Sequence, residues 1–210
     1  MKDKYIAAKE RWAAKRAGQA APRERSTGRV PPGQRVVTNF PVLDLGAHPE
    51  VTCADWNLKI HGHVDNPVKL DWRQFMALDQ FKDTSDFHCV TTWSQLDMAW
   101  EGVSFFTLAE LVQPKDTATH VFFKSHDGYS TNTTLEALMD DDTLIAHTWN
   151  GAPLAIEHGG PARVIVPKLY AWKGAKWVKE IIFLDRNILG FWEVRGYSNT
   201  ADPWIEDRHS

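Results

Sequence analysis

Residues 158–177 contain the most specific pattern in the chain, which reads His158-Gly159-Gly160-Pro161-Ala162-Arg163-Val164-Ile165-Val166-Pro167 and, after two residues, Tyr170-Ala171-Trp172-Lys173-Gly174-Ala175-Lys176-Trp177. The β-branched run predicts a strand over 163–166. Arg163 presents a planar charged fork suited to phosphate, Lys173 or Lys176 can add a point charge, and the glycines let backbone approach a ligand closely. Taken alone, the segment fits a solvated basic strand and turn better than an anion site.

Upstream, a second run reads Asp86-Phe87-His88-Cys89-Val90-Thr91-Thr92-Trp93-Ser94. A lone cysteine is most often a small buried apolar residue. If the run is extended, neighbouring side chains point to opposite faces, so His88 is badly placed to act as a base for Cys89. Another base would have to come from His126, His147 or His158, and nothing in the sequence pairs one of these with Cys89.

Composition limits the class of protein. A chain of 210 residues with 43% apolar and 11% aromatic residues can form one well-cored domain, or a domain with an extended arm. Its ten tryptophans supply core mass or pocket walls. The two cysteines, Cys53 and Cys89, argue against a disulfide scaffold and favour a reducing compartment.

Charge divides the chain at its N-terminal end. Residues 1–35 hold ten Lys/Arg against three Asp/Glu, whereas the rest holds 14 against 24. We therefore predict a basic arm and connector over 1–34 and one domain over 35–210, with the arm packed on the acidic body or on a neighbouring subunit. No motif for nucleic-acid recognition accompanies the arm. No secretory, twin-arginine or membrane-spanning segment is visible, so we expect a cytoplasmic protein without membrane insertion.

Local patterns predict short strands with a few short helices. The expected strands are Val36–Phe40, Trp56–Val64, His120–Ser125, Arg163–Val166 and Trp177–Leu184. The expected helices are Leu70–Leu78, with Asp71 near its start, Thr107–Leu111, with Thr107 as N-cap, and Leu135–Met139. Because strands and helices do not alternate regularly, the fold class is α+β, with mixed sheets and not a doubly wound sheet.

Together, the runs around Cys89 and Arg163 resemble the molybdopterin-dependent oxidoreductases of the sulfite oxidase family, in particular short bacterial members that consist of the catalytic domain alone and are related to the periplasmic methionine sulfoxide reductase catalytic subunit. The resemblance covers roughly residues 35–195. It implies mixed β-sheets with peripheral helices and a molybdenum-molybdopterin cofactor held deep inside. It also implies oxygen-atom transfer on a small-molecule substrate, with electrons exchanged with a separate redox partner.

The resemblance also assigns roles to individual residues. Cys89 falls at the molybdenum-coordinating cysteine, and a soft thiolate suits that metal. His158 stands where the periplasmic reductases have Asn, which would make this contact sensitive to pH. The positions that match cofactor-binding residues of the family are Asn39, Val42, Leu43, Ser125, His158, Arg163, Gly174, Ala175 and Lys176.

One departure from the family concerns the substrate. Sulfite oxidases of animals and plants follow their ligand cysteine with a short run that ends in paired arginines. Here the run Val90-Thr91-Thr92-Trp93-Ser94 contains no arginine, so the sequence does not support an oxyanion pocket for sulfite. We expect the walls of the pocket to include Trp93, Trp100, Tyr129 and Trp172.

Two other classes stay open at this point. The tryptophan content is compatible with a non-enzymatic, aromatic-rich ligand-binding module, which would purify colourless and free of metal. A cysteine-dependent acyl-transfer enzyme would instead show a low thiol pKa and form a covalent adduct with electrophilic probes at Cys89.

Overall fold

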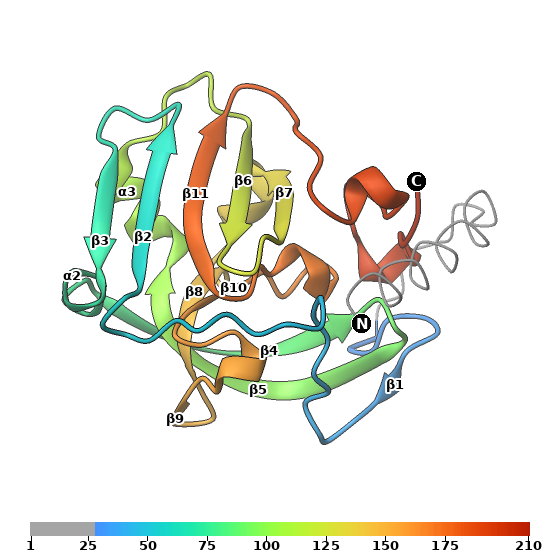
Figure 1. The fold of residues 1–210 in the computed structure, drawn as a ribbon. Coiled ribbons are helices and arrows are strands. Elements are labelled where there is room, and N and C mark those ends of the chain that lie inside the picture. Colours follow the sequence, from blue (N-terminus) through green and yellow to red (C-terminus); the bar gives the residue numbers. More distant parts are fainter. Residues whose placement is uncertain (1–27) are drawn as a thin grey trace.

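The computed structural model describes residues 28–210, so most of the predicted basic arm lies outside the described residues. In the described part, the strands form two sheets with short helices around them (Figure 1). The strands are β1 (Arg35–Val36), β2 (Asn57–Gly62), β3 (Val68–Asp71), β4 (Gln80–Cys89), β5 (Trp93–Ser104), β6 (His120–Ser125), β7 (Ser130–Thr134), β8 (Leu144–Trp149), β9 (Ala152–Pro153), β10 (Arg163–Ile165) and β11 (Val178–Leu184). The α-helices are α2 (Trp72–Met76), α3 (Phe105–Val112) and α4 (Leu135–Leu138), and the 3-10 helices are η1 (Ile156–His158), η2 (Ala171–Lys173), η3 (Glu193–Arg195) and η4 (Pro203–Ile205).

The first sheet is built on the long β4–β5 hairpin. Its strand order is β1-β5-β8-β10, with β4 paired to β5 and β9 paired to β8. The antiparallel register runs from Gln80 opposite Val103 to Cys89 opposite Trp93. The outer half of β4 is exposed on alternate residues, whereas its last three residues are all buried. The hairpin therefore runs from a solvated outer end to a buried inner end, where β4 ends at Cys89.

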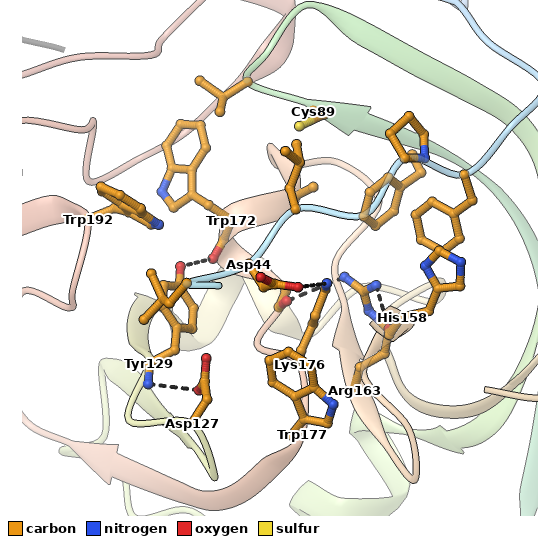
Figure 2. Close-up of a pocket in the computed structure, with 18 of the residues that line it drawn as sticks. Asp44, Cys89, Asp127, Tyr129, His158, Arg163, Trp172, Lys176, Trp177 and Trp192 are labelled. Carbon is orange, nitrogen blue, oxygen red and sulfur yellow. Dashed lines mark hydrogen bonds and ion pairs between the residues drawn. The ribbon is translucent and has the colours of Figure 1, made fainter. Parts of the chain in front are cut away.

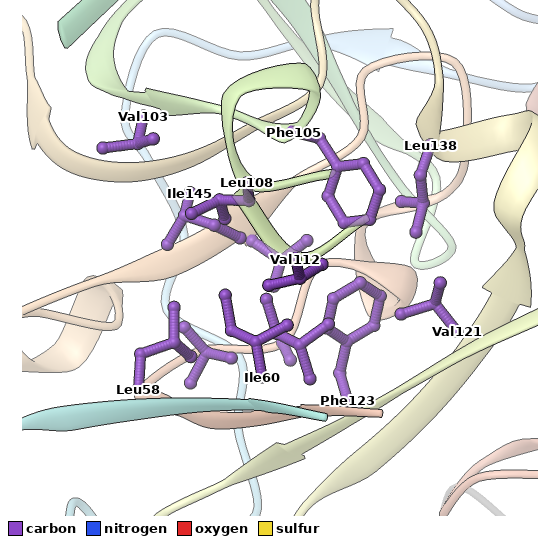
Figure 3. Close-up of a cluster of buried hydrophobic side chains, with 14 of the residues drawn as sticks. Leu58, Ile60, Val103, Phe105, Leu108, Val112, Val121, Phe123, Leu138 and Ile145 are labelled. Atoms are coloured by element: carbon purple, nitrogen blue, oxygen red, sulfur yellow. The ribbon is translucent and has the colours of Figure 1, made fainter. Parts of the chain in front are cut away.

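The second sheet has the order β3-β2-β11-β6-β7, in which β2 and β11 run parallel and the other neighbours are antiparallel. Alternate residues point to one face, so Leu58 and Ile60 on β2 and Val121 and Phe123 on β6 enter the same core. Helix α3 covers this core (Figure 3). Each of these side chains is fully buried, which stabilises the fold by roughly 1.5–3 kcal/mol per residue before entropy is counted. The predicted α+β class with mixed sheets is confirmed.

Each described α-helix begins after a side chain that caps its N-terminus, and the predicted starts of two helices need correction. Leu70 and Asp71 pair with β2, so they end strand β3, and the helix predicted from Leu70 begins at Trp72. Asp71 accepts from the Gln74 backbone N–H at 2.8 Å and completes a capping box. Helix α3 begins at Phe105, because Ser104 and not Thr107 is the N-cap; the Thr107 backbone N–H donates to Ser104 Oγ at 3.1 Å.

One strand has its predicted limits, another is much shorter than predicted, and several were not predicted. His120–Ser125 was predicted with its observed limits, whereas the strand expected over Val36–Phe40 is reduced to β1 and the chain then turns toward a pocket. No strand was predicted for β4, β5, β7 or β8. No helix among residues 28–210 is long and apolar enough to cross a bilayer.

Residues 28–34, the described part of the predicted connector, lie on the β4–β5 hairpin. The Arg29 guanidinium pairs with Asp86 at 2.7 Å and with Asp97 at 2.6 Å. Gln34 Nε2 donates to the carbonyl of Cys89 at 3.1 Å. The boundary between residues 34 and 35 stays a prediction.

Candidate functional site

A pocket lies where the inner end of the β4–β5 hairpin meets five other segments of the chain (Figure 2). It holds about 770 Å³ of space between its walls, open solvent at its mouth included. Its walls are formed by Phe40, Pro41, Leu43, Asp44, Leu45, Phe87, Cys89, Val90, Trp93, Asp127, Tyr129, His158, Arg163, Ala171, Trp172, Gly174, Lys176, Trp177, Trp192 and Tyr197.

Cys89 ends strand β4 and lines the pocket, with 6% of the residue exposed. Its Sγ lies 3.2 Å from Thr91 Oγ1. His88 points to the opposite side of the strand, where its Nδ1 lies 2.9 Å from Ser94 Oγ and its ring edge meets Trp204. Burial lowers the pKa of His88 to about 4. The extended conformation thus separates His88 from Cys89, as predicted.

Arg163, on β10, brings a buried positive charge into the same pocket (Figure 2). Its two terminal nitrogens donate to the carbonyls of His158 at 2.9 Å and Gly174 at 3.5 Å. Its Nε has no hydrogen-bond partner, and no carboxylate among residues 28–210 pairs with it. Burial lowers the pKa of Arg163 to about 10, so the group is charged at neutral pH. Its charge is available to an anionic ligand.

Lys176 places a second cation beside Arg163. Its Nζ donates to the carbonyl of Glu157 at 2.6 Å and lies 3.6 Å from Asp44 Oδ2. Burial, and then the neighbouring charge of Arg163, lower the pKa of Lys176 to about 8, against the opposing effect of Asp44. Lys173, the other lysine predicted to serve an anion, instead makes a fully buried ion pair with Glu193 at 2.7 Å.

Two glycines make room for this pair of cations. Gly159 has φ +104°, and a Cβ there would lie 3.0 Å from the Lys176 Cβ and 3.1 Å from the Arg163 Cβ. A Cβ on Gly174 would lie 2.6 Å from the carbonyl oxygen of Val164. A side chain at Gly159 would press on the two cations themselves, and one at Gly174 would displace the backbone of the strand that carries Arg163.

His158 lies on the wall next to Arg163. Its ring stacks on Phe40 with centroids 4.2 Å apart and meets Trp149 edge-on at 5.5 Å. Burial, followed by the charges of Arg163 and Lys176, lowers the pKa of His158. The imidazole is therefore neutral at physiological pH. Any pH sensitivity of this position, as predicted from the sequence, would lie at acidic pH.

Aromatic rings form the wall on the other side of the pocket. The Tyr129 hydroxyl donates to the carbonyl of Trp172. The Trp172 and Trp192 rings lie 5.2 Å and 5.1 Å from the Tyr197 ring. Trp93, Tyr129 and Trp172 line the pocket as predicted, whereas Trp100 is buried in the cluster behind Phe40.

The remaining sequence-predicted residues lie in different surroundings. Leu43 lines the pocket, whereas Asn39 and Val42 are exposed and lie outside its lining. Ala175 is buried, and its carbonyl accepts from the Val164 backbone N–H. Ser125 is buried, and its Oγ has no hydrogen-bond partner among the described residues. The cofactor contacts assigned to these residues stay predictions.

The lining residues that the sequence analysis missed include Asp44, Asp127, Trp177 and Tyr197. Each comes from a different segment, and no periodicity links them. The only usable signal was the dipeptide Asp127-Gly128, which follows a predicted strand and is typical of a hairpin turn.

Comparison with known families gives a match to the oxidoreductase molybdopterin binding domain over residues 45–192. The uncharacterized oxidoreductase YuiH of Bacillus subtilis is 42% identical over 183 residues, which span 87% of this chain and 92% of that protein. The protein-methionine-sulfoxide reductase catalytic subunit MsrP of Gluconobacter oxydans is 30% identical over 174 residues, or 72% of this chain and 55% of that protein. This chain thus aligns with about half the length of MsrP.

Among solved structures, the sulfane dehydrogenase SoxCD of Paracoccus pantotrophus has a similar fold, with a TM-score of 0.60 over 66% of this chain and 40% of that chain. Its sequence identity of 22% supports likeness of fold alone. The match agrees with the predicted mixed-sheet architecture. Part of the pocket, including Phe40, Asp44 and Tyr197, lies outside the family match over residues 45–192.

Proposed function

This chain belongs to the oxidoreductase molybdopterin binding domain family, and from that premise we propose that its pocket holds molybdenum-molybdopterin with Cys89 as the protein ligand of the metal. The observation that carries the proposal is the presence in one pocket of a cysteine and of Arg163, a buried cation without a carboxylate partner among residues 28–210. The protein is an oxidoreductase of the molybdopterin-dependent class.

The cation pair suits the phosphate end of a pterin. A buried charge without a counter-charge costs several kcal/mol. A phosphate beside Arg163 and Lys176 would offset that cost, accept from the unpartnered Arg163 Nε and raise the depressed pKa of Lys176. Gly159 and Gly174 keep the wall of the pocket free of side chains that would push the two cations apart.

Cys89 suits the metal end. A Cys89 thiolate raises the pKa of Arg163, so by reciprocity the guanidinium favours the thiolate that binds a metal. Within residues 28–210, no group of three or more His, Cys, Asp or Glu side chains gathers as metal ligands. A metal at Cys89 therefore needs further ligands, and the sulfur atoms of a pterin dithiolene are of the soft type that a thiolate site accepts.

The bound group would supply oxygen-atom exchange with a substrate, coupled to one-electron steps with a separate redox partner. The chain's own residues would position the cofactor and exclude water from the site. Arg163 and Lys176 would fix one end of the cofactor, and Cys89 the other. The Trp172, Trp192 and Tyr197 rings would keep the space beside Cys89 apolar, which strengthens electrostatic interactions there.

We further propose that the substrate is an uncharged oxo-compound, and sulfoxides are the first class of compound to test. The two cations would be neutralised by the cofactor, and the Val90–Ser94 run adds no arginine beside Cys89. An aromatic wall without a free cation suits a neutral sulfur compound better than sulfite or nitrate. The 30% identical MsrP carries the name of a methionine sulfoxide reductase, which supports the same choice.

We propose the cytoplasm as the location. Neither Cys53, which is exposed, nor Cys89, which is buried, forms a disulfide, as suits a reducing compartment. Cell fractionation of the native host decides this point, since recovery in the periplasmic fraction would contradict it.

The deciding experiment is elemental and pterin analysis of protein from a host that makes molybdopterin. Wild type and Cys53→Ser should each contain about one molybdenum and one pterin per chain, whereas Cys89→Ser should lose the metal. Cys53 is the matched control, because it is exposed and lies outside the pocket lining. Equal metal in the two serine variants would rule out Cys89 as ligand.

The acyl-transfer alternative is tested with the same proteins. It requires a base near Cys89. His88 lies across the strand, and His147 Nε2 lies 2.9 Å from Gln80 Oε1, so the candidate left in the pocket is His158, whose ring lies flat on Phe40. We expect no acyl-enzyme on incubation with activated esters. A stable adduct at Cys89, formed faster than at Cys53 in metal-free protein, would favour the acyl-transfer enzyme.

A further inference from the structure

We propose that Gln34 and Arg208 are positioning residues, which hold the loop Cys89–Thr92 in the conformation that turns Cys89 toward the pocket. The inference rests on the proposed role of Cys89 as the metal ligand. Both residues lie outside the family match over residues 45–192. They come from the two segments that flank the matched domain, one on each side of it in the sequence.

The loop is strained and is held through its backbone carbonyls. Thr92 has φ +72°, which is the left-handed region that non-glycine residues rarely adopt. The Cys89 carbonyl accepts from Gln34 Nε2 at 3.1 Å and from the Thr92 backbone N–H at 3.1 Å. The Val90 carbonyl accepts from an Arg208 terminal nitrogen at 2.7 Å. A strained turn persists only when its surroundings hold it, and these contacts supply that restraint.

Arg208 is itself held firmly. It is 5% exposed, and its guanidinium carbon lies 5.2 Å from the centre of the Tyr170 ring. Its carbonyl accepts from the Ser198 backbone N–H at 3.1 Å, and the Ala201 carbonyl accepts from the Tyr170 backbone N–H at 2.9 Å. These contacts hold the C-terminal segment against the segment that carries Trp172. The position of the Arg208 guanidinium beside the loop is therefore fixed by its surroundings.

Gln34 holds the loop from the opposite flank. Its side-chain oxygen accepts from Ser94 Oγ at 3.4 Å, while its amide nitrogen serves the Cys89 carbonyl. The next residue, Arg35, donates its backbone N–H to the Thr92 carbonyl at 3.1 Å. The loop is therefore held from both flanking segments, whereas the hairpin register itself ends at Cys89 opposite Trp93.

The test measures the freedom of the Cys89 loop in metal-free protein. In a Cys53→Ser background, Cys89 is the only thiol, and its rate of reaction with an aromatic disulfide reports how often the loop opens. Arg208→Met should raise that rate on the order of tenfold, the factor expected for one lost buried hydrogen bond. Gln34→Glu keeps an acceptor for the Ser94 hydroxyl but loses the N–H donor to the Cys89 carbonyl, so it should raise the labelling rate severalfold. Arg29→Met is the matched control, because Arg29 contacts the same hairpin at Asp86, and it should leave the rate unchanged.

A second measurement uses the loaded enzyme. If the loop sets the direction of the Cys89 sulfur, Arg208→Met and Gln34→Glu should shift the electron paramagnetic resonance signal of the one-electron-reduced molybdenum, and Arg29→Met should not. If Arg208→Met does not fold, Gln34→Glu decides both measurements. Labelling rates and spectra equal to those of the parent would overturn the proposal. Loss of metal in Cys89→Ser tests the proposed function separately, since the labelling experiment needs no metal.

Discussion

The ring of His158 lies flat on the ring of Phe40, with centroids 4.2 Å apart and planes within 5° of parallel. Burial and the charges of Arg163 and Lys176 lower the pKa of this imidazole from its ordinary 6.5, so the folded protein holds the neutral form. The unfolded chain binds the proton more readily. The contribution of His158 to stability is thus complete above pH 6.5 and is lost as the pH falls toward the lower folded pKa.

We predict that the free energy of unfolding of the metal-free protein falls between pH 7 and about pH 5, and that His158→Asn makes this fall smaller. Urea denaturation at both pH values measures it. Phe40→Leu serves as the control, because it removes the stacked ring but keeps the titrating group. It should cost about 1 kcal/mol at both pH values and preserve the pH dependence. A fall of the same size in wild type and His158→Asn would contradict the prediction.

Gly159→Ala and Gly128→Ala form a matched pair that separates backbone strain from displacement of the cations. Both glycines have positive φ, at +104° and +89°, but a Cβ on Gly128 meets nothing within 4 Å, whereas a Cβ on Gly159 meets the Lys176 and Arg163 side chains at 3.0 Å and 3.1 Å. We expect each variant to lose roughly 1–2 kcal/mol of stability through strain. Only Gly159→Ala should also lower the molybdenum and pterin content. Equal cofactor content in the two variants would show that the packing at Gly159 does not align the cations.

The sequence predicted best where one segment carries its own signal. Strand β6 was predicted with its observed limits, because His120–Ser125 is rich in β-branched and aromatic residues and has breaker residues nearby. The β4–β5 hairpin was missed, since the outer half of β4 is polar on both faces and is stabilised by pairing with β5 and not by a buried stripe. Thr107 was taken as an N-cap because the hydroxyl of Ser104, three residues earlier, was overlooked as the better-placed acceptor.

The site residues, too, were predicted where a short segment carries a signal and missed where tertiary contacts place them. Arg163, Gly174 and Lys176 stand in one short segment, and the family resemblance joined them to Cys89; the structure does place all four in the lining of one pocket. Asp44 enters that pocket from before the family match over residues 45–192. Its approach to Lys176 depends on how the chain crosses the hairpin after β1, and tertiary contacts of this kind leave no local pattern.

The buried pair of Lys173 and Glu193 connects the elements that carry Trp172 and Trp192. The two groups lie 2.7 Å apart with both side chains fully buried, and Thr131 Oγ1 also donates to Glu193 at 2.7 Å. Lys173→Met leaves a buried carboxylate without its counter-charge, so we predict a loss of about 3–5 kcal/mol in the free energy of unfolding.

Adding Glu193→Gln to that variant removes the stranded charge while keeping an acceptor for Thr131. The double variant should therefore be more stable than Lys173→Met alone, by a margin that chemical denaturation resolves. Additive losses would mean that the two side chains contribute independently. Lys168→Met, which removes a lysine that pairs with Asp140 at the surface, should cost less than about 1 kcal/mol and controls for loss of a lysine as such.

Lys176 gives the anion site a pH dependence of its own. Because burial and Arg163 lower the pKa of Lys176 to about 8, the metal-free protein loses one of its two pocket cations as the pH rises through that value. Sulfate keeps its charge over this range, so its affinity should fall on the order of tenfold above pH 8, the factor expected for one charged hydrogen bond. Bound sulfate favours the charged lysine, so the midpoint should move to higher pH as sulfate is added. Thermal shift at constant ionic strength measures both effects.

Two variants at the same position make this test specific. Lys176→Arg keeps its charge at alkaline pH, so its sulfate affinity should stay flat where that of wild type falls. Lys176→Met should bind sulfate weakly at every pH, at the level that wild type reaches above its midpoint. If Lys176→Arg follows the wild-type curve, the titrating group lies elsewhere, and the second cation of the phosphate site would have to be sought among the other pocket residues.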